Sequence, residues 1–482
     1  MAPSRGLFVL VTNPTATPDV ASEVVVVGAG LGGLLAALLL AEDGHRVVVL
    51  ERDGAEPPGE PAGAWDEWER RGVAQFRQLY YLLPRFRHVA DRELPALSAA
   101  LEKVALRHDP LAGMAGAGVG DDDVVTLTAR RPTVEAVVAR LAAMHPGIEI
   151  RRGVVVNGLT RTPAAAGSVP DVAGVSTAMG EVAANLVVDA TGRRSPLSAW
   201  LAAIGVPPVP EVVEDSGFVY HSRHFRSSDG AMPALSAPLL RHFGSLSVLL
   251  LPAEAGTWGV GLITSSRDEE LRSLHRPDRW MAVARALGPV VRWVEGEPIT
   301  GVDVMTRLED RRRTLCRDSR PLVTGVVPLA DAWASTNPTL GRGTTLAILH
   351  AVALRDTLRA VGLADPARFS LAWHDVTERD LGPHYDAIVT ADRHRLAEID
   401  AAVAGVPYEG GDVAWRAYRM LEDVAHLDVE LLRGWYRIAG LIAPGTEVFA
   451  ADGFLRRVAR AARRSTVEPL PTRHELIALA TG

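Results

Sequence analysis

The stretch that decides the fold runs from Val24 to Asp53 and reads VVVVGAGLGGLLAALLLAEDGHRVVVLERD. Four β-branched valines come first, and glycines and then a run of alanines and leucines follow them. A second apolar run, Val47 to Leu50, ends at Glu51. This order predicts a strand, a tight turn, a helix and a second strand, which together make the first βαβ unit of a parallel sheet.

The glycines have the spacing of the dinucleotide-binding fingerprint, and Glu51 stands about 20 residues further on, where that fingerprint places an acid. Gly28 permits the turn, Gly30 lets backbone N–H groups approach a pyrophosphate, and Gly33 lets the helix and the strand pack closely. We expect Glu51 to accept hydrogen bonds from the adenosine ribose hydroxyls. The sequence therefore predicts a dinucleotide site at this turn.

A membrane helix is the alternative interpretation of the same residues. The run from Val24 to Ala41 holds 18 residues without a charge, and Gly28 and Gly32 have the spacing of a GxxxG contact. A uniform helix does not explain why valines precede the glycines and helix formers follow them, so we expect no transmembrane segment. The apolar run at 6–11 is too short for the core of a signal peptide.

Composition excludes several classes of protein. The chain has 482 residues, of which 48% are hydrophobic and 23% charged, and its formal net charge is −7. It is therefore expected to be a globular protein of several domains with no nucleic-acid partner. The single cysteine, Cys316, is expected to be a buried structural residue in a reducing compartment, the cytoplasm. No Cys/His spacing predicts a metal site.

The pattern of apolar residues divides the chain into segments. These are an N-terminal extension at 1–21, a first nucleotide-binding part at 22–205, an inserted antiparallel domain at 206–305, a second nucleotide-binding part at 306–365 and a helical region at 366–482. Helices are predicted around 78–107 and from Pro132 to about Ala143, the latter because proline suits the first turn of a helix. The charged clusters at 309–313 and 457–464 are expected to face solvent.

Three separated motifs resemble those of the aromatic-hydroxylase class of FAD-dependent monooxygenases. They are GAGLGG from Gly28, DATG from Asp189 and ADAWASTNPTLGRG from Ala330. Within that class the chain looks closest to the branch of olefin epoxidases and flavin-dependent halogenases, because RRGVAQFR at 70–77 resembles a segment of polyether-type epoxidases. The resemblance implies an α/β fold with a Rossmann-type, glutathione-reductase-like FAD-binding domain, an inserted antiparallel β-sheet substrate domain and a helical C-terminal region.

The resemblance also implies roles for single residues. Gly28, Gly30, Gly33 and Glu51 would hold the ADP half of FAD, Arg131 would lie near the pyrophosphate, Val156 would offer its backbone to adenine, Asp331 would bind the ribityl chain, and Pro338, Gly341 and Gly343 would lie against the flavin ring with Gln75 beside it. Independently, the Asp331 carboxylate suits a polyol, because hydroxyl groups donate hydrogen bonds to it. Gly341 and Gly343 would present bare N–H groups at the positive end of a helix.

Two departures from the family pattern affect these expectations. Ala330 stands where the family carries glycine, which leaves the neighbouring carboxylate in place. Thr191 and Gly192 stand where self-sufficient hydroxylases carry an Asp-Gly pair. Because that acid is associated with the nicotinamide donor, we expect NAD(P)H to supply electrons through a separate flavin reductase.

The resemblance implies a monooxygenase that uses dioxygen, through a flavin hydroperoxide, to epoxidise or hydroxylate a small hydrophobic secondary metabolite. The sequence identifies no catalytic side chain, and Tyr220, His221 and His224 in the inserted domain are expected to be structural. A flavin-dependent halogenase, a flavin-linked reductase or desaturase, and a non-catalytic flavin-binding protein remain alternatives. Halogenases of this branch carry a lysine beside the flavin, whereas the one lysine here, Lys103, lies in an amphipathic helical pattern and is expected to face solvent.

Overall fold

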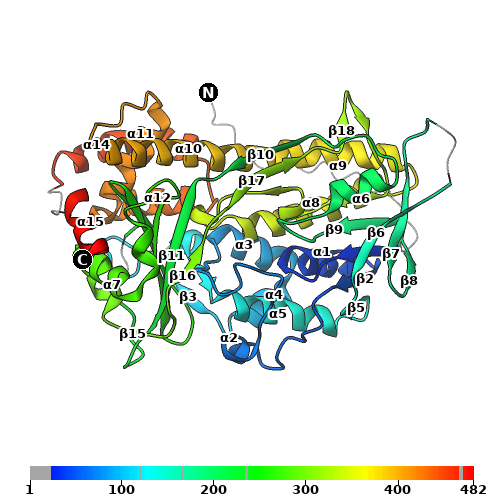
Figure 1. Ribbon diagram of the computed structural model, residues 1–482, viewed down its shortest axis with the longest axis horizontal. Coiled ribbons are helices and arrows are strands. Elements are labelled where there is room, and N and C mark those ends of the chain that lie inside the picture. Colours follow the sequence, from blue (N-terminus) through cyan, green and yellow to red (C-terminus); the bar gives the residue numbers. More distant parts are fainter. Residues whose placement is uncertain (1–22, 119–120, 164–166, 234–236, 466–469) are drawn as a thin grey trace.

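The computed structural model describes residues 23–118, 121–163, 167–233, 237–465 and 470–482, so the predicted extension at 1–21 lies outside the described residues. Its central element is a five-stranded parallel sheet, seen with its helices in Figure 1. In spatial order the strands are β20 (Val326–Pro328), β9 (Leu186–Asp189), β1 (Glu23–Val27), β2 (Arg46–Glu51) and β5 (Ile148–Arg152).

The four valines of β1 show why this strand has no polar position. Val24 and Val26 belong to the core on one face of the sheet, and Val25 and Val27 belong to the core on the other. Successive side chains of a strand point to opposite faces, so a central strand that is covered on both sides reads as a continuous apolar run. The 18-residue run at Val24–Ala41 therefore divides into β1 and the helix α1 (Leu31–Glu42).

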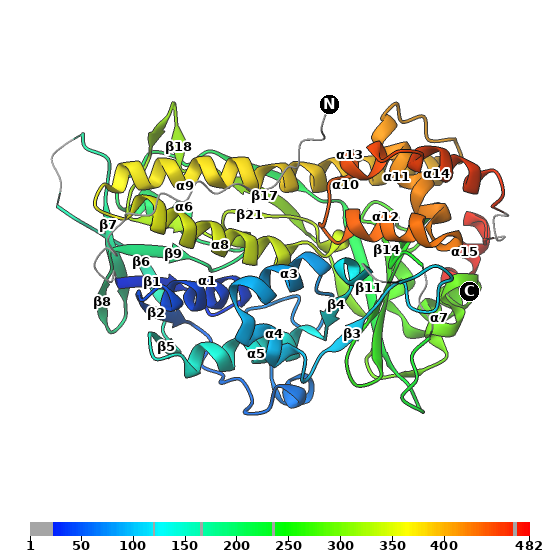
Figure 2. The same ribbon diagram turned by 180° about the vertical axis from the view of Figure 1, so that it is seen from behind.

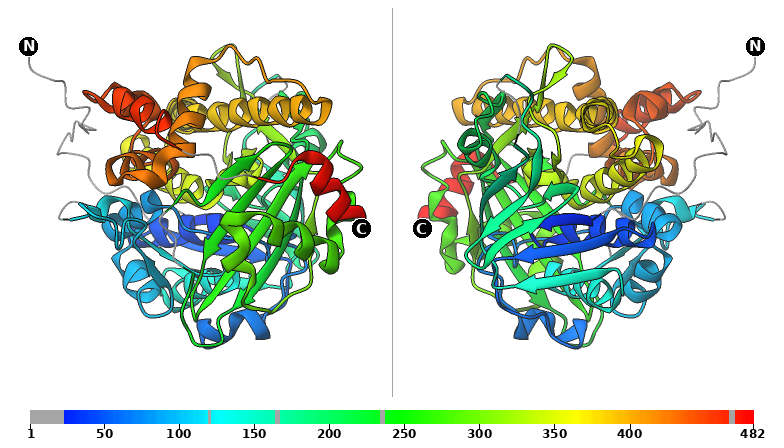
Figure 3. Two further views of the ribbon diagram at one scale, coloured as in Figure 1. Left: turned by 90° about the vertical axis from the view of Figure 1, so that its left-hand side faces the viewer. Right: turned by 90° about the vertical axis from the view of Figure 1, so that its right-hand side faces the viewer.

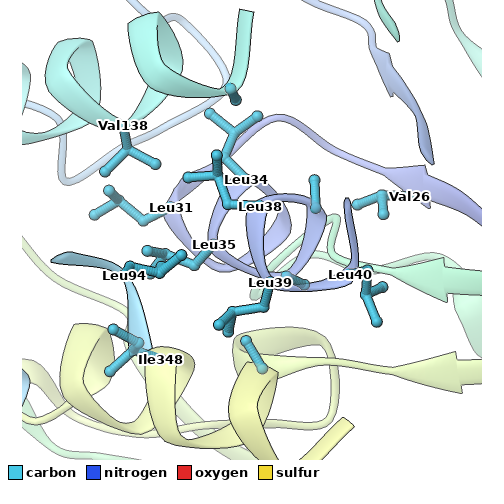
Figure 4. Packing of buried hydrophobic residues seen from close by; sticks show 14 of the residues in the cluster. Val26, Leu31, Leu34, Leu35, Leu38, Leu39, Leu40, Leu94, Val138 and Ile348 are labelled. Carbon is cyan, nitrogen blue, oxygen red and sulfur yellow. The ribbon is translucent and has the colours of Figure 1, made fainter. Parts of the chain in front are cut away.

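Helices cover one face of the sheet and a second sheet covers the other. The helical face holds α1, α5 (Arg131–Met144) and α8 (Gly343–Val361), and Figure 4 shows the leucines of α1 between Val138 of α5 and Ile348 of α8. The other face holds the antiparallel strands β6 (Val156–Arg161), β7 (Val172–Thr177) and β8 (Gly180–Ala183) with helix α6 (Leu197–Ala203). Among the described residues no helix is long and apolar enough to cross a membrane.

The helices predicted around 78–107 form over a shorter range. After the short helix α2 (Ala64–Glu67) come α3 (Pro84–Glu93) and α4 (Pro95–Leu101), and β3 (Leu106–His108) follows and pairs with β4 (Thr126–Thr128). Each helix begins at a proline, which cannot continue a preceding helix. Lys103 lies in the turn after α4 and is exposed. The prediction that it faces solvent is confirmed, and the prediction that it lies in a helix is wrong. Helix α5 begins one residue before Pro132, as predicted.

The inserted segment forms a six-stranded antiparallel sheet, as predicted. In spatial order its strands are β12 (Leu240–Phe243), β13 (Leu246–Pro252), β14 (Thr257–Ser265), β11 (Phe218–Arg226) and β15 (Glu297–Pro298), with β16 (Asp303–Met305) also paired to β11. Helix α7 (Pro277–Ala286) packs on its outer face, and the last helix, α15 (Arg473–Thr481), packs against α7. Figure 3, left, shows α15 in red beside this green sheet.

A small sheet connects the inserted segment to the nucleotide-binding part. It contains β10 (Glu211–Asp215), β17 (Glu309–Arg313) and β21 (Ala334–Ser335), and the nearby pair β18 (Cys316–Arg317) and β19 (Arg320–Pro321) holds the buried Cys316. The prediction that 309–313 faces solvent is wrong, because β17 is the central strand of this sheet and has a buried side chain on each of its faces. Asp310 is 3% exposed and Arg313 is 1% exposed. The Arg313 guanidinium donates to Glu211 and to the Ala332 carbonyl.

The C-terminal region is helical, as predicted. Helix α9 (Pro366–Asp380) packs along α8, and α10 (Gly382–Ala404), α11 (Val413–Val424), α12 (Val429–Ala439), α13 (Gly445–Ala450) and α14 (Phe454–Ala462) follow. Leu249 and Leu251 of the inserted sheet share one core with Trp435 and Tyr436 of α12. Figure 2 shows α11 to α14 in orange and red beside that sheet, at the opposite end of the molecule from β8.

Candidate functional site

A cavity of about 930 Å³ runs from the carboxyl ends of β1 and β2 to the inserted sheet and α12. This volume is near the upper end of the range for cofactor and ligand sites, about 300–1,000 Å³, and the ends of parallel strands are where such sites form in α/β sheets. Ten of the eleven predicted site residues line it: Gly28, Gly30, Glu51, Gln75, Arg131, Val156, Asp331, Pro338, Gly341 and Gly343. Gly33, predicted for packing, is not among the lining residues.

Each glycine of the first turn has a geometric reason to be glycine. Gly28 has a φ of +108°, and a Cβ there would lie 2.6 Å from the Ala190 carbonyl oxygen. A Cβ on Gly33 would lie 2.1 Å from the Gly28 carbonyl oxygen, so α1 packs directly on the turn. No heavy atom lies within 4 Å of a Cβ placed on Gly30, and Gly30 lines the cavity. No side chain caps the first amides of α1, so these amides can donate hydrogen bonds to an anion.

The carboxylate of Glu51 is held firmly at the cavity wall. Its Oε2 accepts hydrogen bonds from Ala29 N at 2.8 Å and from Arg70 Nη2 at 2.9 Å, and its Oε1 accepts one from Asp53 N at 2.9 Å. An ionised carboxylate has about four acceptor sites, so Glu51 retains capacity for a hydroxyl donor. Binding of a ribose by Glu51 stays a prediction.

Asp53 is a site residue that the sequence did not reveal. It lines the same end of the cavity as Glu51, and its Oδ2 is buried without a hydrogen-bond partner in the described part of the chain. A buried, unsatisfied carboxylate oxygen is unusual in a folded protein, and a ligand with a hydrogen-bond donor at this place would satisfy it. Its position two residues after the fingerprint acid is the only signal that the sequence carries.

Three charged side chains form a buried network beside Glu51. Arg70 Nη1 donates to Glu135 Oε2 at 2.7 Å, and Arg131 Nε donates to Glu135 Oε1 at 2.6 Å. Burial alone would raise the pKa of Glu135, but the two arginines hold it below its ordinary value. Because every charge in the network is paired, Arg131 has a fixed orientation at the start of α5, on the cavity wall. The sequence signal was the i,i+4 spacing of Arg131 and Glu135.

Asp189 organises the DATG loop after β9. Its Oδ1 accepts hydrogen bonds from Thr191 N at 3.0 Å and from Thr191 Oγ1 at 2.6 Å, and its Oδ2 accepts one from Ser195 Oγ at 2.5 Å. Burial raises the pKa of Asp189 in spite of these bonds. The loop is thereby folded against Gly28, where the Ala190 carbonyl meets the first turn. The Thr191 hydroxyl therefore makes its hydrogen bond within the loop.

The late motif brings a carboxylate and a helix N-terminus to the middle of the cavity. Asp331 lies in a single 3-10 turn, Ala330–Ala332, and Gly343 is the first residue of α8. No heavy atom lies within 4 Å of a Cβ placed on Gly343, and no side chain caps the first amides of α8. These amides can therefore interact with an electron-rich ring edge.

The inserted sheet forms the roof of the cavity through Tyr220 of β11. The Tyr220 hydroxyl is hydrogen-bonded to Asn337 Oδ1 and to Thr339 Oγ1, on either side of Pro338. His221 and His224 do not line the cavity, and burial lowers their pKa values to about 4 and about 3. They are core residues, as expected. The described residues contain no cluster of three metal-ligating side chains.

The two features associated with halogenases lie elsewhere. Lys103 is exposed in the turn after α4 and does not line the cavity. Trp258 is buried in the inserted domain, where its Nε1 donates to the Trp293 carbonyl at 2.7 Å. Neither side chain can act between a flavin ring and a substrate in this cavity.

The cavity fits FAD on three observations. Open space faces Gly30 at the first helix N-terminus, the Asp53 carboxylate has a free buried oxygen, and open space faces Gly343 at the second helix N-terminus. A pyrophosphate, a ribose and a flavin ring edge are the chemical groups that these three places favour.

Comparisons with known proteins agree with this geometry. Residues 26–74 match the family model described as an NAD(P)-binding Rossmann-like domain. The chain is 28% identical over 463 residues to Protein Rv3254 of Mycobacterium tuberculosis, which covers 90% of this chain and 89% of that protein.

Solved structures share the fold over most of the chain. PqsL of Pseudomonas aeruginosa, a probable FAD-dependent monooxygenase, superimposes with a TM-score of 0.58 at 19% identity over 80% of this chain and 98% of its own. The flavin-dependent brominase Bmp2 superimposes with a TM-score of 0.59 at 16% identity over 92% of this chain and 100% of its own. The chain therefore has the fold of FAD-dependent monooxygenases, and the resemblance inferred from the three motifs is confirmed at that level.

Proposed function

We propose that this protein is an FAD-dependent monooxygenase that transfers one oxygen atom from dioxygen to a small hydrophobic substrate by epoxidation or hydroxylation. One observation carries the proposal: a single cavity joins a dinucleotide-type site at Gly28–Gly33 to an apolar chamber beside the late motif. PqsL, which shares the fold, has been solved in complex with 2-aminobenzoylacetate, a small molecule.

The first half of the cavity would hold the cofactor. Glu51 and Asp53 would accept hydrogen bonds from the ribose, the amides of α1 would receive the pyrophosphate beside Arg131, and Asp331 would accept hydrogen bonds from the ribityl hydroxyls. When bound, FAD supplies the redox chemistry with dioxygen, whereas the protein supplies binding and orientation. The amides of α8 would place positive potential at the edge of the ring, which favours its reduced, anionic form.

The second half of the cavity would hold the substrate. Its walls are mainly apolar or aromatic side chains from the inserted sheet and the C-terminal helices: Leu239, Leu240, Leu249, Leu251, Tyr418, Trp435 and Tyr436. Such walls exclude water and orient a hydrophobic molecule against the ring. Tyr220 of the inserted sheet is hydrogen-bonded on either side of Pro338 and therefore holds in place the loop that forms the floor of this chamber.

The electron supply is the second part of the proposal. Because Thr191 stands where direct users of NADPH carry an acid, we propose that a separate flavin reductase delivers electrons from NAD(P)H. The isolated protein is expected to oxidise NADPH slowly even with substrate present. Rapid bleaching of the flavin absorbance by NADPH alone, followed by stopped-flow spectroscopy, would contradict this part without affecting the rest.

One experiment tests the main proposal. The purified protein is expected to be yellow and to release FAD on denaturation. Incubated with a generic flavin reductase, NADPH and a panel of hydrophobic alkenes and electron-rich aromatics, it is expected to consume dioxygen and to give a product that gains the mass of one oxygen atom. Oxygen consumption without such a product, or a protein that binds no flavin, would overturn the proposal.

The same assay separates the alternatives. A halogenase is favoured only by the likeness to Bmp2, and the exposed position of Lys103 opposes it. Added bromide is therefore expected to leave the product unbrominated, and Lys103→Ala is expected to retain activity. Loss or gain of two hydrogens without added oxygen would indicate a desaturase or a reductase, and flavin binding without turnover of any substrate would indicate a binding protein.

A further inference from the structure

Arg342 is a charged side chain without a partner at the junction of the two halves of the cavity. It stands between Gly341 and Gly343 and lines the cavity. Its side chain forms no hydrogen bond and no ion pair with any residue that the structure describes, and its Nε is buried without an acceptor. A buried guanidinium that lacks an acceptor is costly unless a ligand supplies one.

The other cavity-lining arginines that are buried or half-buried all have acceptors. Arg70 donates to Glu51, Arg131 donates to Glu135, Arg193 donates to the Glu309 carbonyl oxygen and Arg311 donates to Glu211. Each of these four guanidinium groups thus donates a hydrogen bond to an acceptor of the protein itself. Arg342 is the exception among these buried and half-buried arginines.

Among the described residues no acid forms an ion pair with Arg342. The acid that acts on it is Asp392 of α10, whose Oδ1 accepts a hydrogen bond from Asn337 Nδ2 at 3.0 Å. Burial raises the pKa of Asp392 well above its ordinary value, which favours the neutral form of this acid. Burial, together with Arg342 itself, lowers the pKa of the nearby His384, which adds no negative charge either.

The surroundings of Arg342 belong to the substrate half of the cavity. Its electrostatic neighbours are Asp392 and His384 on α10 and Tyr418 on α11, all far along the chain from the first turn at Gly28. Tyr418 and Trp435 line the cavity together with the leucines of the inserted sheet. The chamber therefore offers apolar walls and, in Arg342, a half-buried guanidinium that has no acceptor among the described residues.

From this arrangement we infer that the substrate has a hydrophobic, aromatic-sized body and one anionic group, a carboxylate or an ionised phenol, and that Arg342 binds that group. The inference rests on the proposed function, because it names the substrate class of the same cavity. A planar guanidinium suits either anion, since it can donate two parallel hydrogen bonds to a carboxylate. The rival role for Arg342 is binding of the flavin ring itself.

The test uses the purified, FAD-loaded protein and two probes that differ only in charge, 2-naphthoate and 2-naphthamide. Binding is measured by the change in flavin absorbance and by calorimetry, and the affinity for FAD is measured separately on the FAD-free protein. We expect 2-naphthoate to bind more tightly than 2-naphthamide. Arg342→Gln is expected to weaken 2-naphthoate binding roughly 10- to 100-fold and to leave 2-naphthamide and FAD binding unchanged.

Two further variants sharpen the result. Arg342→Lys keeps the charge without the planar fork and is expected to recover part of the affinity for 2-naphthoate. Arg416→Gln removes an exposed arginine from α11, the helix that carries Tyr418, and is expected to bind both probes as the wild type does.

Several outcomes would overturn the inference. They are equal binding of the acid and the amide, binding of neither probe, an unchanged affinity in Arg342→Gln, or a loss of FAD affinity in that variant, which would assign Arg342 to the cofactor. A protein that binds no FAD would instead defeat the proposed function, and calorimetry with 2-naphthoate would still decide the role of Arg342.

Discussion

Asp331 is the residue on which the cofactor half of the cavity depends most. Asp331 lines the cavity, and the backbone of the short turn Ala330–Ala332 sets the direction of its carboxylate. Asp331→Ala is expected to weaken FAD binding by about 1.5–3 kcal/mol, because a charged acceptor of hydroxyl hydrogen bonds is removed. Fluorescence titration of the FAD-free protein measures the effect. Asp375→Ala, an exposed aspartate on α9, is the control, and equal affinities of both variants would remove Asp331 from the site.

Ala330 shows that the departure from the family glycine has a structural consequence. Its φ is +51°, the left-handed region in which a Cβ is unfavourable by roughly 1–2 kcal/mol. Ala330→Gly is therefore expected to raise the free energy of unfolding by about 0.5–1 kcal/mol, measured by denaturant titration. Ala332→Gly, two residues along the same turn and without a positive φ, is expected to lower it by a similar amount. Destabilisation by both changes would contradict the strain at Ala330.

Most of the residues that the sequence predicted for the site line the cavity, but the sequence did not predict their hydrogen-bond partners. Gly28, Glu51 and Asp331 could be placed because motif spacing fixes them on local turns. The bonds from Arg70 to Glu51 and to Glu135 join three segments that meet only in the folded chain. Motif spacing carries no information on such contacts, and for the same reason it could not show that Arg342 lacks a partner.

Among the structural elements, the loop between β13 and β14 fixes the inserted sheet to the nucleotide-binding part. Glu254 in this loop is buried, and its carboxylate accepts hydrogen bonds from Arg130 N and Nε, both at 2.8 Å, and from Thr133 Oγ1 at 2.9 Å. The bonded groups lie at the start of α5. The Glu254 side chain therefore helps to hold the roof of the cavity against its wall.

Removing the charge of Glu254 tests this connection. Glu254→Gln is expected to lower the free energy of unfolding by about 3 kcal/mol, the lower end of the range for losing one partner of a buried ion pair, because Arg130 remains buried. Denaturant titration measures the loss. Glu297→Gln, on the exposed edge strand β15, is the control and is expected to change stability by less than about 0.5 kcal/mol. Equal effects of the two changes would show that the connection carries little energy.

Elements with strong periodicity were predictable and short charged elements were not. The first βαβ unit and α5 follow from apolar runs and from Pro132. Strand β17 could not be recognised, because its five residues EDRRR are all charged and it is stabilised by tertiary ion pairs rather than by apolar burial. Tertiary context decided its conformation against its local composition.

For the molecule as a whole, buried histidines make stability depend on pH. Burial lowers the pKa of His224 to about 3. The folded state therefore does not bind a proton there at pH values where the unfolded chain, with a pKa near 6.5, does. Stability contributed by the neutral ring is complete above about pH 6.5 and is lost as the pH falls towards 3.

His224→Phe isolates this contribution. Relative to the wild type, the variant is expected to gain about 1.4 kcal/mol of stability for each unit by which the pH falls between about 6 and 4, because the phenylalanine side chain binds no proton on unfolding. Unfolding curves at several pH values measure the difference. His474→Gln, at an exposed histidine of α15, is expected to run parallel to the wild type. Parallel curves for His224→Phe would contradict the depressed pKa.

The position of α15 against α7 has a consequence for synthesis on the ribosome. Leu476 and Ala480 complete the core of the inserted domain, more than 150 residues after its last strand, and β20 completes the parallel sheet only after that domain has been made. A nascent chain that ends before Val326 can therefore close neither core. The core of the parallel sheet can close once β20 and α8 have been made, whereas the inserted domain keeps apolar surface accessible to chaperones until α15 has emerged.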